Sequence, residues 1–159
     1  ESHRKRYCRH NCQEAHSMIT GMIRSKLLAT SAVTALVSTR IYVDDIPDPA
    51  TLPAISISKA SYVPNKEVGK KKFERIQVSC WAEPGNPKNP AVVESVAAAV
   101  RAVFDFPRCN FAPYRLTSSV SSTAYDVTSS HCRGGFRLID PKTGWYHIPV
   151  DLELDYNEV

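Results

Sequence analysis

The hydrophobic and polar residues alternate along the last stretch of the chain, GWYHIPVDLELDY, from Gly144 to Tyr156. One set of alternate positions holds Tyr146, Ile148, Val150, Leu152, Leu154 and Tyr156, and the other includes Trp145, His147, Asp151, Glu153 and Asp155. Successive side chains of a strand point to opposite faces, so this pattern predicts a half-buried β-strand. The three carboxylates on its polar face have two interpretations: a solvated face, or a surface that repels something negative.

Two stretches predict helices. From Met18, apolar residues recur at helical spacing: Ile19, Met22, Ile23, Leu27 and Leu28. The run ATSA should break this helix, with Ser31 capping a short second turn that buries Val33, Leu36 and Val37. The second helix is predicted over Ala91–Phe104, with Asn89 as N-cap, Pro90 in the first turn and Pro107 ending it. Its apolar stripe is predicted to be Val92, Val96, Val100, Val103 and Phe104.

Strands are predicted between and after these helices. Pro47, Pro49 and Pro53 favour an extended, irregular connection, after which Ala54–Tyr62 is a predicted strand with Ile55 and Ile57 on one face. A second strand, Phe73–Glu83, should direct Ile76, Val78 and Cys80 to one face and Arg75, Gln77, Ser79 and Trp81 to the other. Together these strands predict a hairpin with a long basic tip.

The last third of the chain is also predicted to be strands. Arg115–Ser130 is rich in Ser, Thr and Val, which favours an exposed or edge strand. Asp140, Pro141 and Gly144 are typical turn residues and predict a final hairpin. The order of elements favours an α+β fold, an antiparallel sheet with two main helices packed on one face.

Length and composition are ordinary for one globular domain. The chain has 159 residues, a formal net charge of +4 and a pI of about 8.8. Residues 1–17 are basic and differ from the rest, so we expect either a basic N-terminal arm or a non-native leader, followed by a single domain over residues 18–159. With no secretory signal in that polar leader and no apolar run of about 20 residues, we expect a soluble cytoplasmic product without a membrane segment. Five cysteines at irregular spacing are expected to be reduced, with Cys80 a core residue.

Candidate chemistry is sparse. Cys8, Cys12 and His16 are spaced four apart and could share a helix face around zinc, but a fourth ligand is not evident. No glycine-rich phosphate loop, G-x-S-x-G or H-E-x-x-H motif occurs. His131 and Cys132 are adjacent and should point apart on a strand, which disfavours a thiol nucleophile with its base. We therefore expect no catalytic residues, no metal, no cofactor and no enzymatic activity.

The basic hairpin tip is a candidate contact surface. Lys66, Lys70, Lys71, Lys72 and Arg75 could meet phosphate or an acidic partner, including a neighbouring subunit. A solvated loop is the simpler interpretation, because no aromatic residues are interleaved with the lysines.

The order of these signals resembles a known family. The segments VTALVSTRIY, LPAISI and QVSCWA, the helix AVVESVAAAVRAVF and the closing IDPKTGWYHIPVDLELDY are similar to those of the small tail-completion proteins of long-tailed bacteriophages. These proteins are also called tail terminators or head–tail joining proteins. The resemblance covers most of the chain from Met18 onward, whereas Thr117–Arg133 matches loosely and the leader has no counterpart.

The resemblance implies a structural virion protein. Such proteins form a ring, commonly hexameric, on the end of the tail tube, stop its growth and offer a surface to neck proteins, and phage DNA later passes through the hole. We therefore expect a homo-hexamer in the virion tail or neck, assembled in the host cytoplasm. Asp151, Glu153 and Asp155 could line the channel and repel DNA. Alternatives are a head-side neck or adaptor protein, a small nucleic-acid-binding module, and an enzyme of unknown type.

Overall fold

The structure, a computed structural model, describes residues 19–61, 71–85, 89–105, 114–117 and 124–159. A first helix covers residues 19–28. The remaining elements are α2 (Ser31–Val37), β1 (Ile41–Val43), β2 (Ala54–Ser61), β3 (Lys71–Ala82), α3 (Ala91–Phe104), β4 (Tyr114–Thr117), β5 (Ala124–Gly134), β6 (Leu138–Ile139) and β7 (Tyr146–Glu158).

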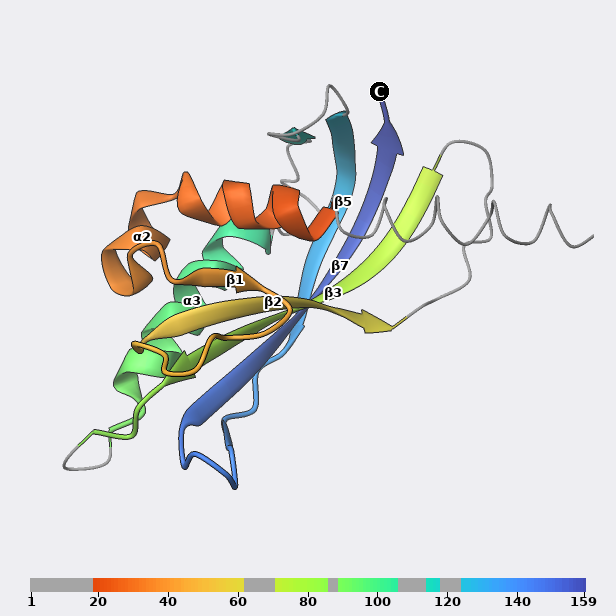
Figure 1. Cartoon of the computed structure of the whole chain (residues 1–159). Coiled ribbons are helices and arrows are strands. Elements are labelled where there is room, and N and C mark those ends of the chain that lie inside the picture. The colour runs from red at the N-terminus through yellow and green to blue at the C-terminus, as the bar shows by residue number, and fades with distance from the viewer. Residues whose placement is uncertain (1–18, 62–70, 86–88, 106–113, 118–123) are drawn as a thin grey trace, which may run out of the picture.

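The strands form one curled sheet, and the helices lie together on one of its faces (Figure 1). The strand order is β1-β2-β3-β7-β5-β4, with β6 pairing on β7 as well. The β1–β2 pair is parallel, and the other pairs within the described residues are antiparallel. The predicted α+β fold with an antiparallel sheet is therefore confirmed, with α2 as a short third helix. None of the helices in the described part of the chain has both the length and the apolar character that a membrane crossing requires.

The last strand occupies the middle of the sheet. On one side β7 pairs with β3 from Tyr146 to Asn157, and on the other side it pairs with β6 and then with β5. The predicted alternation is confirmed. Its apolar set faces the helices and is buried throughout: Tyr146, Ile148, Val150, Leu152, Leu154 and Tyr156.

The core lies between that face of the sheet and the helices. The first helix contributes Ile19, Met22, Ile23 and Leu27, and β2 and β3 add Ile55, Ile57, Ile76, Val78 and Cys80. Burial raises the pKa of the Cys80 thiol to about 12, as expected for an unreactive core cysteine. A buried hydrogen bond of 2.6 Å from Ser130 Oγ to the carbonyl oxygen of Phe104 joins β5 to the last turn of α3.

The N-caps of α2 and α3 each differ from the prediction by one residue. Thr30, not Ser31, is the N-cap of α2. Its hydroxyl donates to the Lys26 carbonyl and accepts no capping hydrogen bond from the backbone N–H groups of α2. The prediction was wrong because Thr30 can close the preceding turn, which leaves Ser31 as the first helical residue. At α3 the N-cap is Pro90, which makes no side-chain cap hydrogen bond, and not Asn89 as predicted. Asn89 precedes it and accepts, at Oδ1, a hydrogen bond of 2.9 Å from the backbone N–H of Ala91.

The buried stripe of α3 is shifted by one residue from the prediction at its start. Val93 is fully buried, whereas the side chain of Val92 is 44% exposed. The buried positions are Val93, Val96, Ala97, Val100 and Phe104. This set follows an i, i+3, i+4 pattern, so Val92 falls beside the stripe rather than on it. The helix ends at Phe104, and Pro107 lies outside the described residues.

The predictions of β2 and β3 hold with shifted ends, whereas the predicted strand Arg115–Ser130 is wrong, because β4 and β5 are two strands that pair antiparallel. β2 and β3 pair antiparallel as a hairpin, with Ile55 and Ile57 opposite Cys80 and Val78. β3 begins at Lys71, two residues before the predicted start. The sequence interpretation missed β1, which is only three residues long and pairs in parallel with β2 from the irregular segment before the prolines.

The final hairpin is closed by the predicted turn. The Asp140 carboxylate accepts hydrogen bonds from the Thr143 hydroxyl and from the backbone N–H groups of Lys142 and Thr143, the last two at 3.3 and 3.2 Å. The bond from the Thr143 hydroxyl is the main reason why the pKa of Asp140 lies below its usual range, and the backbone bonds add to it. Gly144 has φ of +71°, a left-handed conformation that favours glycine. We name residues 134–145 the arm. They project beyond the N-terminal end of α3 (Figure 1).

Val93→Ala and Val92→Ala form a matched pair that tests this burial. We expect Val93→Ala to lower the free energy of unfolding by about 2 kcal/mol, since two buried methyl groups are lost and a cavity remains. Val92→Ala should change it by less than about 0.5 kcal/mol. Chemical denaturation of both variants measures the difference, and equal losses would contradict the assigned stripe.

Candidate interaction surface

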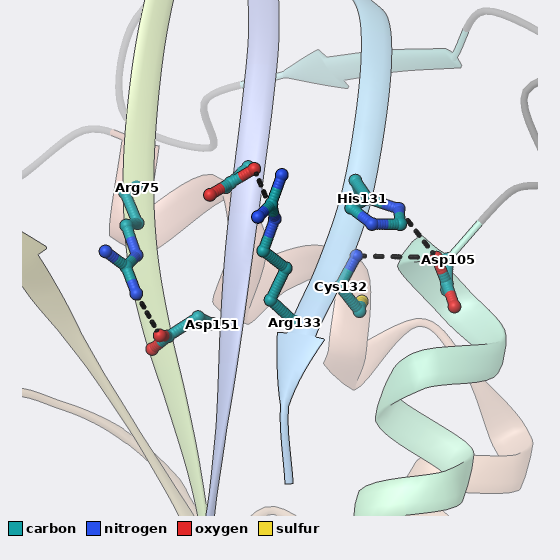
Figure 2. A network of polar contacts seen from close by, with 7 residues as sticks. Arg75, Asp105, His131, Cys132, Arg133 and Asp151 are labelled. Atoms are coloured by element: carbon teal, nitrogen blue, oxygen red, sulfur yellow. Dashed lines mark hydrogen bonds and ion pairs between the residues drawn. The ribbon is translucent and has the colours of Figure 1, made fainter.

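The polar face of β7 is paired with arginines from both neighbouring strands. Asp151 forms an ion pair with Arg75 of β3 (Figure 2). Gln77 donates to the same carboxylate at 3.3 Å. The side chains of Asp151 and Arg75 are 18% and 39% exposed. The hydrogen bond to Asp151 and its charge raise the pKa of the Arg75 guanidinium.

The same arrangement is repeated on the other side of β7. Arg133 of β5 lies 3.0 Å from a carboxylate oxygen of Glu153, whose side chain is 21% exposed. Further along the sheet, Arg115 of β4 makes two hydrogen bonds to Asp126 of β5, at 2.7 and 3.1 Å, which lower the pKa of Asp126. Alternating charges therefore cross this face from strand to strand, and we name these three pairs the arginine–carboxylate row.

The predicted acidic set is thus brought together, but not as a bare negative row. Asp151, Glu153 and Asp155 all lie half-buried on one face of β7, as the alternation predicted. Asp155 lies opposite Phe73 of β3 and Ser129 of β5. The arginine partners could not be found from local pattern, since Arg75 and Asp151 are 76 residues apart in the chain.

The predicted basic contact set is only partly described. Lys66 and Lys70 lie outside the described residues, as do the side chains of Lys71 and Lys72. Arg75 is described and is joined to Asp151. The structure therefore brings one member of the basic set together with one member of the acidic set.

The edge of β5 meets the end of α3 at Asp105 (Figure 2). Asp105 Oδ1 lies 3.4 Å from His131 Nδ1 and accepts a hydrogen bond of 3.4 Å from the backbone N–H of Cys132. Burial raises the pKa of the Cys132 thiol to about 12, which disfavours the thiolate that a nucleophile needs. Asp105 here satisfies an outward-facing backbone group and so helps to protect a strand edge.

Metal ligands are not clustered in the described part of the chain. No group of three or more His, Cys, Asp or Glu side chains that could hold an ion occurs there. The candidate zinc residues Cys8, Cys12 and His16 lie outside the described residues.

An aromatic cluster at the start of β7 was missed by the sequence interpretation. His147, on the polar face of β7, is stacked on Trp81 with ring centroids 4.0 Å apart and an interplanar angle of 2°. Trp145 meets Trp81 edge-on at 6.5 Å, and Trp81 Nε1 donates to the Ser56 hydroxyl at 3.0 Å. Trp81 and His147 are directly opposite each other on β3 and β7, which brings their rings together. This contact could be predicted only with the register of the two strands known.

The arm carries three of the exposed large apolar side chains of the described residues. Phe136 is 82% exposed, Ile139 61% and Leu138 50%. Arg137, between them, reaches back to Glu94 of α3 at 3.4 Å and lies 5.4 Å from the centroid of the Tyr146 ring. The sequence interpretation identified the hairpin here but not its exposed apolar surface.

These features define a small α+β protein whose notable surfaces suit contact with other macromolecules. A model of the family described as Tail completion protein gp17 matches residues 21–154, and the chain belongs to this family. Membership identifies it as a structural protein of bacteriophage tails, as the resemblance predicted.

Solved structures agree with the fold. A chain of the structure titled "Virion of native gene transfer agent (GTA) particle" is similar, with a TM-score of 0.62 and 16% identity, covering 85% of this chain and 91% of that chain. At this identity the likeness shows the fold alone. A second solved chain matches with 16% identity over 87% and 94% of the two chains, but its TM-score of 0.47 supports no argument. The comparison with curated protein sequences gave no match.

The stacked imidazole predicts a pH effect on stability. Burial lowers the pKa of His147 from 6.5, so the folded protein binds a proton there less readily than the unfolded chain. The stabilisation is complete above about pH 6.5 and is lost as the pH falls through the lowered value in the folded state. His147→Phe keeps an aromatic ring on Trp81 and should lose less stability than the wild type between pH 7.5 and pH 5. Denaturation at both pH values measures this, with His131→Asn as control; equal losses in wild type and His147→Phe would refute it.

Proposed function

We propose that this protein caps the tail tube as a hexameric ring, ends tube growth and joins the tail to the head. The family match over residues 21–154 carries the proposal. Its partners would be copies of itself, the tail tube protein and the neck or connector proteins, with phage DNA passing through the ring. Assembly would take place in the host cytoplasm, and the protein would remain in the tail or neck of the virion.

The surface features favour a structural role over chemistry. The thiol of Cys132 has a pKa raised to about 12, and its neighbour His131 is directed to Asp105. By contrast, the arm displays apolar side chains that a folded chain in water gains nothing by exposing. An assembly protein uses such surfaces for its neighbours, so we propose a role without enzymatic activity.

The polar face of β7 is the proposed channel lining. Asp151, Glu153 and Asp155 would face the hole and reduce adhesion of DNA phosphates. Because Arg75 and Arg133 neutralise two of these acids, the repulsion would be moderate. Lys66, Lys70, Lys71 and Lys72 would then face a partner or a neighbouring subunit.

Deletion of the gene tests the main proposal. We expect free DNA-filled heads together with unjoined tails, many of them overlong, because nothing stops tube growth. Electron microscopy of the lysate measures both outcomes. Finished tails of normal length beside unjoined heads would favour a head-side adaptor, and normal virions would refute both assembly roles. Tight binding of the purified protein to duplex DNA with a steep salt dependence would instead favour a nucleic-acid-binding module.

Charge neutralisation tests the channel lining. The triple variant Asp151→Asn, Glu153→Gln, Asp155→Asn should stay folded and lose about 1–2 kcal/mol of stability, since partly exposed ion pairs contribute little. It should form particles that transfer DNA less efficiently. Arg75→Gln with Arg133→Gln is the matched control, because it breaks the same ion pairs but leaves the face more negative. Normal DNA transfer by the triple variant, or equal defects in both, would exclude a role for negative charge on this face.

A further inference from the structure

The arm is an apolar surface whose backbone and side chains contact α3 within the same subunit. Arg101 of α3 donates to the carbonyl oxygen of Gly134 at 3.3 Å. Gly135 has φ of +120°, and a Cβ there would overlap the guanidinium of Arg101. The ion pair of Arg137 with Glu94 fixes the arm to α3 at a second point. These contacts restrict the conformations of the arm, which lowers the entropic cost of a contact made through Phe136, Leu138 and Ile139.

The arm lies at one edge of the sheet, and the segment after β1 lies at the opposite edge, at the same position along the strands. Leu138 pairs with His147, which pairs with Trp81, which pairs with Ala54. One residue further along the strands, Ile148 pairs with Cys80, Cys80 pairs with Ile55, and Ile55 pairs with Ile41 of β1. β1 and β6 are therefore the two outer strands of the same end of the sheet.

The two segments also begin at matching levels. The arm starts at Gly134, which pairs with Val150, and Val150 pairs in turn with Val78, which pairs with Ile57. The backbone N–H of Asp44, which follows β1, donates to the carbonyl oxygen of Ile57. We name residues 44–53 the acidic loop. A second copy displaced sideways along the sheet would bring its acidic loop to the level of the arm.

The charges of these segments are opposite. The acidic loop contains Asp44, Asp45 and Asp48, all exposed, and no lysine or arginine. The arm contains the exposed Lys142, while its Asp140 is engaged by the turn and its Arg137 by Glu94 of α3. Within the described part of the chain no ion pair involves Lys142 or the three aspartates of the loop.

The acidic loop also offers apolar surface. Pro47 and Pro49 are exposed and Ile46 is half-buried. Proline rings and an isoleucine side chain are suitable partners for an exposed phenylalanine and two aliphatic side chains, because their contact removes apolar area from water without breaking backbone hydrogen bonds.

We propose that the arm of one copy docks on the acidic loop of a second copy. Phe136, Leu138 and Ile139 lie against the proline-containing surface, and Lys142 faces the aspartates. Since the two surfaces lie on opposite edges of the sheet, the contact is head-to-tail and repeats from copy to copy. Such a contact closes into a ring when the rotation between copies permits, rather than into a twofold dimer. The inference rests on the proposed ring and assigns its subunit contact.

Site-specific crosslinking tests the contact in assembled particles. Phe136, which is 82% exposed, is replaced by a photoreactive phenylalanine analogue in the full-length chain, and purified particles are irradiated. We expect a crosslinked dimer of this chain whose peptides map to residues 44–53. The same analogue at Val159, which is 65% exposed, is the control and should not give that crosslink. Crosslinks from position 136 to another tail protein, to another part of this chain, or to nothing would overturn the inference.

Charge reversal provides an independent readout. Lys142→Glu and Asp45→Lys should each lower incorporation of the protein into particles by about tenfold or more, because like charges then face each other across the contact. The combination of both changes should restore incorporation to near the wild-type level, and absence of restoration would contradict this pairing. If particles lack the wild-type protein, the proposed function itself fails. If they contain it and the crosslink maps elsewhere, only the docking inference fails.

Discussion

The central position of β7 is the constraint on which the rest of the structure depends. This strand has neighbours along both edges, with β3 on one side and β5 with β6 on the other. One of its faces closes the core beneath the helices, so a shift of register by one residue would place Asp151 and Glu153 in the core. The alternation over thirteen residues therefore fixes the register of the neighbouring strands as well as the burial of β7 itself.

That register explains the polar face. Once β3 and β5 are fixed against β7, Arg75 and Arg133 lie within reach of Asp151 and Glu153, and the carboxylates are partly neutralised inside one subunit. The same register stacks Trp81 on His147. A face that looks uniformly acidic in β7 alone becomes a row of alternating charges when its neighbours are included, which moderates its expected effect on a nearby polyanion.

The arm has a different physical character. Its position depends on side chains of α3, through Arg101 and Glu94, and on a glycine that leaves room for a guanidinium. The buried core is formed without Phe136, Leu138 and Ile139, so folding of the subunit does not require these side chains to be exposed. An apolar projection on one edge, opposite a negatively charged loop on the other, suits a protein that acts as part of an assembly.

The sequence by itself determined the α3 helix, the burial of alternate residues in β7, the β2–β3 hairpin and the turn at Asp140. Each of these depends on residues only a few positions apart, whose spacing matches the period of a helix, a strand or a turn. Local pattern failed where flanking residues compete, as at Thr30 and Val93, and where an element is as short as β1. Only the tertiary structure decided which arginines meet the acids, that His147 lies on Trp81, and that the arm and the acidic loop are opposite edges of one sheet end. These relations join residues distant in the chain, and they are set by strand order and register, which no local periodicity contains.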